Sequence, residues 1–524
     1  MQSSTAPADA SAPASTRKSA VLAVMCLALA VVVGMLASLL VAVPDMARDL
    51  RATEAELQWI MNAYGVSFAG LLLLGGALGD RYGRKGVLLT GLAVFALASG
   101  AVLWTDDVDL VIGLRGLAGI GAALVMPMTL SIVTNVYPPE ERGRAVGIWS
   151  GVSFGSALLA VLLAGALLEA YSWRSVFLVN AMLGALALVA AVVLAPTSRS
   201  ARSGPLDVAG AVLSVVGVGA LVFGIVEGPE LGWSDGVVLT AFSVGAAGLS
   251  AFVLWEARSA HPLLDVKIFR LRGVAAGSLV ITAESLAMFG FFFLGLQYLQ
   301  QILGYSPLQS GLALVTMAVG AMVFSPVAPG FARRYGMRAV VGLGMALIAA
   351  GLGLLAATTD GGGLGPFLTA TSLLGAGIAF AATPATEAIV AALPPAKQGV
   401  ASALNDLTRE LGGVLGIAVL GSVFNTTYRS ETGEAVGGLP DEAADAARDS
   451  LAGALRVASE LDGRPGAQLA DAAREAFNSG MTNALLGGIA VVLLGAAAAV
   501  ALMPRRARRR SDASGVKDPR ATSR

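Results

Sequence analysis

The chain is dominated by apolar runs that are long enough to cross a lipid bilayer. Only 13% of its 524 residues are charged, against about 25% in an average soluble protein. Because only helices and closed barrels satisfy every backbone group inside lipid, we expect an all-α integral membrane protein. Charged or Gly- and Pro-containing segments separate fourteen predicted transmembrane helices, at 20–43, 57–78, 86–104, 109–134, 145–168, 175–195, 207–226, 236–255, 274–298, 308–330, 338–358, 365–391, 399–424 and 482–503.

The same composition excludes several classes of chemistry. Cys26 is the one cysteine and His261 the one histidine, which excludes a disulfide framework and a metal site built from Cys or His clusters. The sequence contains no P-loop, so we expect no ATP use. A polytopic membrane enzyme is the less favoured alternative, because the short loops offer no acidic or histidine cluster. We therefore expect no catalytic residues, no metal and no cofactor.

Lys and Arg in the short loops predict the orientation of the chain. With an even number of spans, both termini lie on one side. An inside N-terminus leaves three basic residues in the short outer loops, namely Arg48, Arg51 and Arg174. The inner segments then hold 22, namely Arg17, Lys18, Arg81, Arg84, Lys85, Arg142, Arg144, Arg199, Arg202, Arg258, Lys267, Arg270, Arg272, Arg333, Arg334, Arg338, Lys397 and five arginines in 505–510. We expect both termini to be cytoplasmic.

Three segments outside the spans have distinct compositions. Residues 1–19 form a Ser-, Ala- and Pro-rich tail that we expect to be disordered and cytoplasmic, and 504–524 form a basic cytoplasmic tail. Residues 425–479 connect the last two spans on the outside and carry a net negative charge. Helical spacing of Ala and Leu predicts two short amphipathic helices there, over 441–455 and 468–477.

Two loop sequences recur at a nearly constant separation. The stretch Y-P-P-E-E-R-G-R-A at 137–145 matches L-P-P-A-K-Q-G-V-A at 393–401, and R-Y-G-R-K at 81–85 matches R-Y-G-M-R at 334–338. We therefore divide the chain into two six-helix halves, 20–195 and 274–503, separated by an inserted pair of spans within 196–273. Parallel six-helix repeats are an architecture of transporters that alternate access by moving one half against the other.

Several motifs are typical of one protein family. The sequence G-A-L-G-D-R-Y-G-R-K at 76–85 resembles the G-x-L-x-D-R-x-G-R-K loop motif of the major facilitator superfamily, and R-G-L-A-G-I-G-A-A at 115–123 resembles its span-four motif. The stretches at 172–180, 298–307 and 405–413 are similar to those of its fourteen-span drug:proton antiporter branch, the EmrB/QacA type. This resemblance implies a secondary transporter that exports amphipathic or hydrophobic organic compounds in exchange for protons.

The resemblance also implies roles for individual residues. The first motif acts in the family as a conformational latch between the halves, which here involves Gly76, Asp80, Arg81, Gly83 and Arg84. Asp80 ends span two, where its carboxylate can meet the N-terminus of a neighbouring helix or Arg84. Local capping of the helix is the alternative interpretation.

Arg115 lies inside span four, and its family role is to couple proton movement to carboxylates in the cavity. A structural arginine that donates to backbone carbonyls is the alternative. The chain also departs from the family pattern. Met35 stands where the branch has an aspartate, Ala160-Val161 replaces the Gly-Pro of the antiporter motif, and Ala118 replaces a glutamine. Because of these departures, an uncoupled or lipid-moving facilitator is retained as an alternative function.

Charged residues inside other spans are further candidates, because a charge in hydrocarbon needs a partner or water. Glu284 lies near the middle of span nine and is the leading candidate for proton coupling or cation binding, with a satisfied structural glutamate as the alternative. Asp406, Arg409 and Glu410 share one region of span thirteen, where Arg409 can pair with Asp406 at i,i+3. Glu387 follows Pro384 in span twelve and lies closer to the inner face.

Span nine is also unusually aromatic. These rings cannot all share one face of a helix, so we expect a stripe of them to face lipid, while Phe289 and Phe292 are candidates to line a cavity beside Glu284. Taken together, the sequence predicts a monomer in the cytoplasmic membrane of the cell. Its expected partners are small amphipathic substrates, protons and the lipid bilayer, and it binds no nucleic acid.

Overall fold

The computed structural model describes residues 14–50, 52, 54–197, 207–260, 262–359, 361–394, 397–437, 439–461 and 463–503. The tails predicted for 1–13 and 504–524, with the Arg-rich cluster, lie outside these residues. The described part is helical throughout. Its elements are α1 (Ala14–Leu50), α2 (Glu54–Tyr82), α3 (Arg84–Ala101), η1 (Val102–Trp104), α4 (Val108–Val136), α5 (Pro139–Ala170), α6 (Arg174–Leu194), α7 (Val208–Leu231), α8 (Gly236–Glu256), η2 (Val266–Arg270), α9 (Arg272–Gln297), a π turn η3 (Tyr298–Ile302), α10 (Pro307–Phe324), α11 (Ala328–Tyr335), α12 (Met337–Ala356), α13 (Leu364–Ala392), α14 (Gln398–Ala435), α15 (Asp441–Asp449), α16 (Leu451–Glu460) and α17 (Arg464–Leu502).

The expectation of an all-α membrane protein is confirmed. Thirteen of the described helices are long and apolar enough to cross a membrane, and α10 with α11 forms a further span that bends by 53°. The span predicted over 308–330 corresponds to this pair of helices, although its bend was not predicted. Pro326 and Pro329 lie at this bend and have no backbone N–H to donate to a continuing helix. Counting the bent pair as one span gives fourteen.

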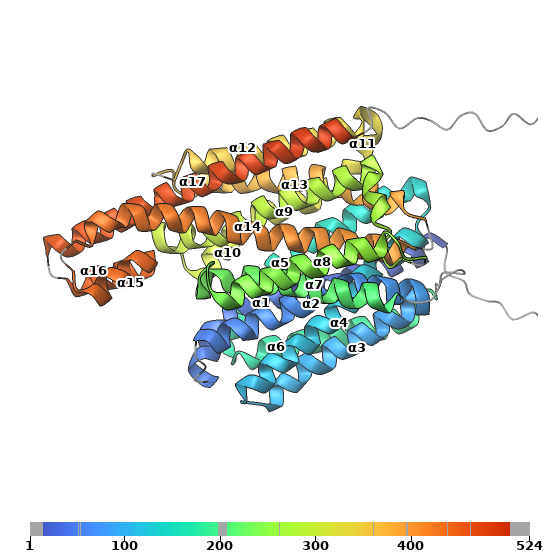
Figure 1. Cartoon of the computed structure of the whole chain (residues 1–524), viewed down its shortest axis with the longest axis horizontal. Coiled ribbons are helices and arrows are strands. Elements are labelled where there is room, and N and C mark those ends of the chain that lie inside the picture. Colours follow the sequence, from blue (N-terminus) through green and yellow to red (C-terminus); the bar gives the residue numbers. More distant parts are fainter. Residues whose placement is uncertain are drawn as a thin grey trace, which may run out of the picture.

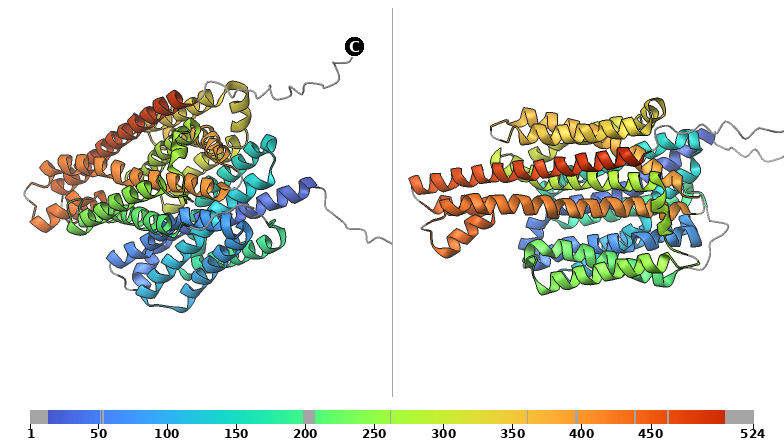
Figure 2. Two further views of the ribbon diagram at one scale, coloured as in Figure 1. Left: turned by 45° about the vertical axis from the view of Figure 1, so that its right-hand side comes forward. Right: turned by 45° about the horizontal axis from the view of Figure 1, so that its top comes forward.

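The helices form two bundles that run side by side (Figures 1 and 2). In one bundle α1 packs on α4, α5 and α6, α2 packs on α4, and α3 packs on α4 and α6. In the other, α9, α13, α14 and α17 pack around one another, with α10 and α12 on α13. The bundles meet where α2 contacts α14 and where α5 contacts α10. The hairpin of α7 and α8 lies beside this junction, because α7 contacts both α2 and α14.

Local sequence explains where several helices begin and end. Asp107, Asp207 and Asp235 each accept a backbone N–H at the start of a helix. Gly83 and Gly336, at matching positions of the loop repeat, both adopt a positive φ, of 107° and 91°. This conformation is open to glycine and strained for other residues, so the two loops make the same turn.

The segment over 425–479 is folded differently from the prediction. Helix α14 continues to Ala435 and α17 begins at Arg464, so both project beyond the other helices and carry α15 and α16 between them (Figures 1 and 2). The predicted separate helix over 468–477 is wrong, because these residues are part of α17. The predicted helix over 441–455 is broken at Ser450, whose side chain caps α16 by accepting from Gly453 N.

This projecting segment has a hydrophobic core of its own. Phe477 is fully buried and packs edge to face on Phe424, with ring centroids 5.0 Å apart. Tyr428 stacks on Phe424 and donates a hydrogen bond to the Ala447 carbonyl. The segment is therefore an ordered helical cap, although its basic side chains are exposed.

We predict that Phe477→Ala exposes this cap to trypsin. The substitution removes a buried ring, at a cost of about 3–5 kcal/mol, and Arg456 on α16 then becomes available in an unfolded segment. Arg464 is not a site, because Pro465 follows it. Limited proteolysis of the purified protein in detergent measures the effect. Leu494→Ala on the exposed face of the same helix is the control, and equal cleavage of both variants would contradict the ordered core.

Candidate functional site

The two bundles approach each other closely at the face where α1 begins and α17 ends, which we call the terminal face. Gly76 of α2 lies against the first turn of α14. A Cβ on Gly76 would stand 2.5 Å from the Gly399 carbonyl oxygen and 2.7 Å from the Ala403 Cβ. Any side chain at position 76 would therefore push the helices apart. This contact explains why a glycine stands there, since small residues let helices in a membrane approach closely.

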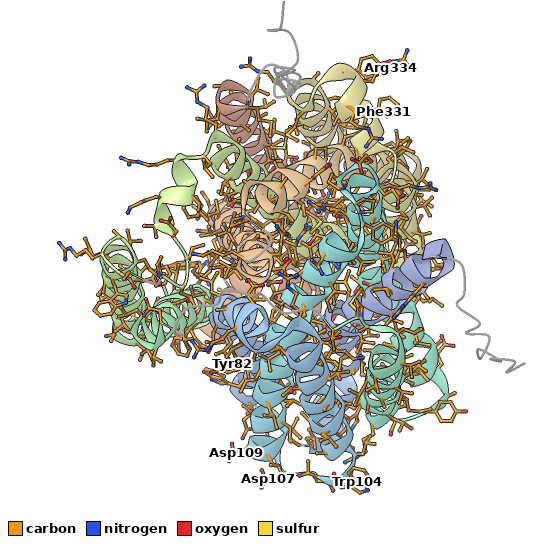
Figure 3. The ribbon with its side chains drawn as sticks, turned by 90° about the vertical axis from the view of Figure 1, so that its right-hand side faces the viewer. Tyr82, Trp104, Asp107, Asp109, Phe331 and Arg334 are labelled. Atoms are coloured by element: carbon orange, nitrogen blue, oxygen red, sulfur yellow. The ribbon has the colours of Figure 1, made fainter. Side chains whose placement is uncertain are left out.

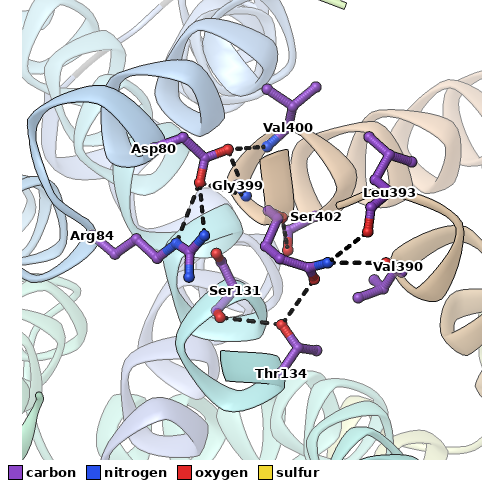
Figure 4. A network of polar contacts seen from close by, with 10 residues as sticks. Asp80, Arg84, Ser131, Thr134, Val390, Leu393, Gly399, Val400 and Ser402 are labelled. Atoms are coloured by element: carbon purple, nitrogen blue, oxygen red, sulfur yellow. Dashed lines mark hydrogen bonds and ion pairs between the residues drawn. The ribbon is translucent and has the colours of Figure 1, made fainter. Parts of the chain in front are cut away.

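Asp80, one turn after Gly76, bridges the same two helices. Its carboxylate accepts hydrogen bonds from Gly399 N at 2.9 and 3.0 Å and from Val400 N at 3.2 Å (Figure 4). Arg84 donates to the same carboxylate from Nη2 at 3.0 Å. Both partners that the sequence predicted for Asp80 are thus present, because the start of α14 presents N–H groups that lack intrahelical acceptors.

The remaining motif residues have different surroundings. Gly83 supplies the turn into α3, and Arg81 lies 5.3 Å from the centre of the Tyr82 ring at the surface. The matching loop of the other bundle repeats this contact between Arg334 and Tyr335, also at 5.3 Å. Viewed onto the terminal face, Phe331 and Arg334 lie at the edge of the molecule, while Tyr82 lies over the first bundle (Figure 3).

Glu284 forms a buried ion pair inside the second bundle. Its Oε1 atom lies 3.7 Å from Arg409 Nη1, and the two side chains are 0% and 6% exposed. The sequence predicts that Arg409 can pair with Asp406, and the structure adds Glu284 as a partner. Close packing of α9 on α14 at a glycine explains why Arg409 also reaches Glu284. A Cβ on Gly412 would stand 2.6 Å from the Thr282 carbonyl, so α9 comes close enough for Arg409 to reach Glu284.

Asp406 and Glu410 belong to the same charged region. Asp406 is fully buried; its Oδ1 accepts a hydrogen bond from Asn405 Nδ2 at 3.2 Å, while Oδ2 has no hydrogen-bond partner among the described residues. Arg409 interacts electrostatically with both carboxylates. One guanidinium therefore faces three acidic side chains, which lets it exchange one partner for another.

Arg115 extends this charged region into the first bundle. Its Nε donates to the Ile60 carbonyl at 2.8 Å, as the structural alternative predicted, and its guanidinium lies 4.7 Å from the centre of the Tyr64 ring. Both Nη atoms lack a hydrogen-bond partner in the described part of the chain. Tyr64 interacts electrostatically with Arg115 and with Glu410. Buried polar groups thus connect α4, α2, α14 and α9 near the middle of the molecule.

A small gap lies beside Glu284, enclosed mainly by apolar side chains. Met288 and Phe291 line it from α9, with Met317, Ile348, Leu374 and Ile378 from neighbouring helices. Phe289 and Phe292 do not line it. Phe289 packs against Gly413 and Phe292 against Phe291. Phe291 is fully buried and does not belong to a lipid-facing stripe, whereas Phe293 is exposed.

Glu387 lies at a second contact between the bundles. A Cβ on Gly143 of α5 would stand 2.9 Å from Glu387 Oε2 and 2.8 Å from the Pro329 Cβ. Arg142 and Arg333 interact electrostatically with the carboxylate. Glu387 therefore faces the start of α5 and does not line the gap beside Glu284.

The face opposite the terminal face has its own polar cluster. Trp173 Nε1 and Arg174 Nη1 donate to Asp49 Oδ2 at 2.7 and 2.8 Å, and Arg174 also bonds Asp106. The hydrogen bonds from Trp173 and Arg174 lower the pKa of Asp49 below its ordinary value. This cluster ties α1, the start of α6 and the loop before α4 together within one bundle.

Sequence reasoning missed four residues. Two are Tyr64 and Asn405, and the others are Thr134 and Gln398, whose hydrogen bond joins α4 to α14 near Asp80. Tyr64 and Thr134 stand in apolar spans with no motif around them. Gln398 had a usable signal, because it falls within the repeated loop sequence and occupies the position that Arg142 has in the other copy.

Comparisons with known proteins agree with this architecture. Residues 25–417 match the family model of the Major Facilitator Superfamily. The chain is 34% identical to the multidrug efflux pump LfrA of Mycolicibacterium smegmatis, over 88% of this chain and 90% of the relative. It is 33% identical to the tetracenomycin C resistance and export protein of Streptomyces glaucescens, over 89% and 88%. The solved structure of the human organic anion transporter MFSD10 matches with a TM-score of 0.60 at 16% identity, over 91% of this chain and 99% of that one.

Proposed function

Because this chain belongs to the Major Facilitator Superfamily, we propose that it exports small amphipathic organic compounds across the cytoplasmic membrane in exchange for protons. It is a multi-pass membrane transporter, and the efflux and export activities named for its relatives support the direction of transport. The proposal needs no cofactor other than the proton gradient. The observation that carries the coupling is the buried ion pair of Glu284 and Arg409.

We propose that the terminal face lies on the cytoplasmic side of the membrane. Its support is the excess of Lys and Arg in the loops on that side. In this orientation the Asp80 contact closes the cytoplasmic ends of α2 and α14. The contact must break each time the cavity opens inward, so it acts as the latch of the cycle.

The coupling mechanism follows from competition for Arg409. A protonated Glu284 cannot hold the guanidinium as an ion pair, and Arg409 then turns toward Asp406 or Glu410 on its own helix. Glu410 interacts electrostatically with Tyr64 in the first bundle, so a change at Glu284 alters the contact between the bundles. Protonation and movement of the bundles are linked through one side chain.

An uncoupled facilitator is the second candidate, and Met35 favours it. Met35 is buried at the position where the antiporter branch has an aspartate. Without that carboxylate, the first bundle has no acidic side chain in span one. In the uncoupled case, the Glu284–Arg409 pair is a fixed structural contact.

Proton flux in liposomes separates these two functions. We predict that adding a cationic amphipathic substrate to proteoliposomes that hold an internal pH probe moves protons in the opposite direction. Vesicles with the Glu284→Gln variant supply the control. Substrate movement without any change of internal pH would reject coupling and leave the facilitator.

A further inference from the structure

Gln398, the first residue of α14, links three helices at the terminal face. Its side chain is 5% exposed. Its Nε2 donates to the carbonyls of Val390 and Leu393 at the end of α13, both at 3.1 Å. Its Oε1 accepts a hydrogen bond from Thr134 Oγ1 of α4 at 3.2 Å. Figure 4 draws these contacts beside those of Asp80.

The next two residues of the same turn hold Asp80. Gly399 N and Val400 N donate to its carboxylate, so three consecutive residues join α14 to both α4 and α2. These N–H groups reach Asp80 only if the first turn of α14 keeps its orientation. The two bonds from Gln398 to the end of α13 fix that orientation.

We propose that Gln398 is a positioning residue of the latch, and that its bond to Thr134 is a second link between the bundles. The inference rests on the proposed orientation of the terminal face. It does not depend on proton coupling.

The hydrogen-bond inventory suits a link that opens and closes. Thr134 has one hydroxyl proton, and its Oγ1 also lies 3.1 Å from the Ser131 carbonyl on its own helix. When the bundles separate, the proton keeps an acceptor at Ser131, and water reaches Gln398 Oε1. Neither group is left buried without a partner, so breaking the link costs no more than the net contribution of one ordinary hydrogen bond.

Ser131 offers a reporter for the open state. Its side chain is fully buried, and its Oγ has no hydrogen-bond partner among the described residues. Ser131→Cys, in a Cys26→Ala background, therefore removes no bond and becomes reactive when α4 and α14 separate. A membrane-impermeant maleimide added to inside-out vesicles measures this opening. Glu140→Cys, at an exposed position on α5, reports which face the reagent meets.

We expect Thr134→Val to raise the labelling rate of Cys at position 131 by about fivefold, the effect of losing one ordinary hydrogen bond. Gln398→Leu loses the bond to Thr134 and both bonds to the end of α13, so it should raise the rate at least as much. Thr134→Ser restores the slow rate because it retains the hydroxyl. Thr316→Val is the matched control, since the Thr316–Thr371 bond, at 2.6 Å, joins α10 to α13 within one bundle. This control should leave the rate unchanged.

Unchanged labelling in both Gln398→Leu and Thr134→Val would overturn the proposal. Asp80→Asn, measured with the same reporter, tests the latch separately. If Asp80→Asn alone labels faster, the latch proposal stands and the positioning role of Gln398 is rejected. Labelling of Glu140→Cys only in right-side-out vesicles overturns the orientation, and with it the inward opening proposed here.

Discussion

Glu284→Gln is expected to abolish transport driven by a pH gradient while exchange of substrate down its own gradient persists. Glutamine keeps the size and the hydrogen-bonding groups of the side chain but binds no exchangeable proton at this position. Asp406 and Glu410 still supply negative charge to Arg409, so the fold survives. The measurement is uptake into proteoliposomes with and without an imposed pH gradient, at equal amounts of monodisperse protein.

Two further variants make this prediction specific. Glu284→Asp retains partial coupling, because a carboxyl group withdrawn by about 1.5 Å still titrates in the same surroundings. Glu256→Gln is the matched control, since Glu256 is also buried but accepts hydrogen bonds from Leu263 N and Leu264 N at the end of α8. Unchanged gradient-driven transport in Glu284→Gln would move the coupling site to Asp406 and Glu410. If the double variant Asp406→Asn with Glu410→Gln also kept normal gradient-driven transport, the uncoupled facilitator would be favoured.

Asp80→Asn is expected to reduce efflux by about tenfold or more while abundance in the membrane is unchanged. The carboxylate accepts hydrogen bonds from Gly399 N, Val400 N and Arg84, and a charged hydrogen bond contributes about 1.5–3 kcal/mol. Losing one such contribution shifts the latch equilibrium by at least about tenfold. The state closed at the terminal face is then depopulated. Efflux of a fluorescent substrate from loaded cells measures the loss.

The control for Asp80 lies at the other face of the same bundle. Asp106 also pairs with an arginine, Arg174, but its side chain is 84% exposed, and exposed ion pairs contribute little. Asp106→Asn should therefore keep normal efflux. Normal efflux by a well-expressed Asp80→Asn protein would show that the motif only caps its helix.

The lengths of the apolar runs predicted the membrane-spanning helices well but not their interruptions. A run of apolar residues says how far a helix can continue in lipid, and thirteen spans followed from that alone. The bend between α10 and α11 needed the Pro326–Pro329 region and the packing of Gly147 against Ser325. The cap over 425–479 has the polar composition of a water-exposed segment, so hydropathy could not show that α14 and α17 continue into it.

The sequence predicted which residues belong to the candidate site, but it did not predict which of them pair with one another. The motif named Asp80, and its position at a helix end predicted a helix N-terminus as partner. That partner is 319 residues away, at Gly399. Arg409 was assigned to Asp406 because i,i+3 spacing is visible in a sequence, whereas the approach of α9 that brings Glu284 to Arg409 is not.

The sequence by itself determined that this chain crosses the membrane about fourteen times, that its charges concentrate in loops and a few buried positions, and that its family is a family of transporters. These properties follow from transfer energies and short motifs, which act over one helix at a time. Only the tertiary structure decided which buried charges meet, how Gln398 and Asp80 hold one turn of α14, and where the bundles touch. The physical reason is that glycines set the distances between helices, and those distances depend on both partners together.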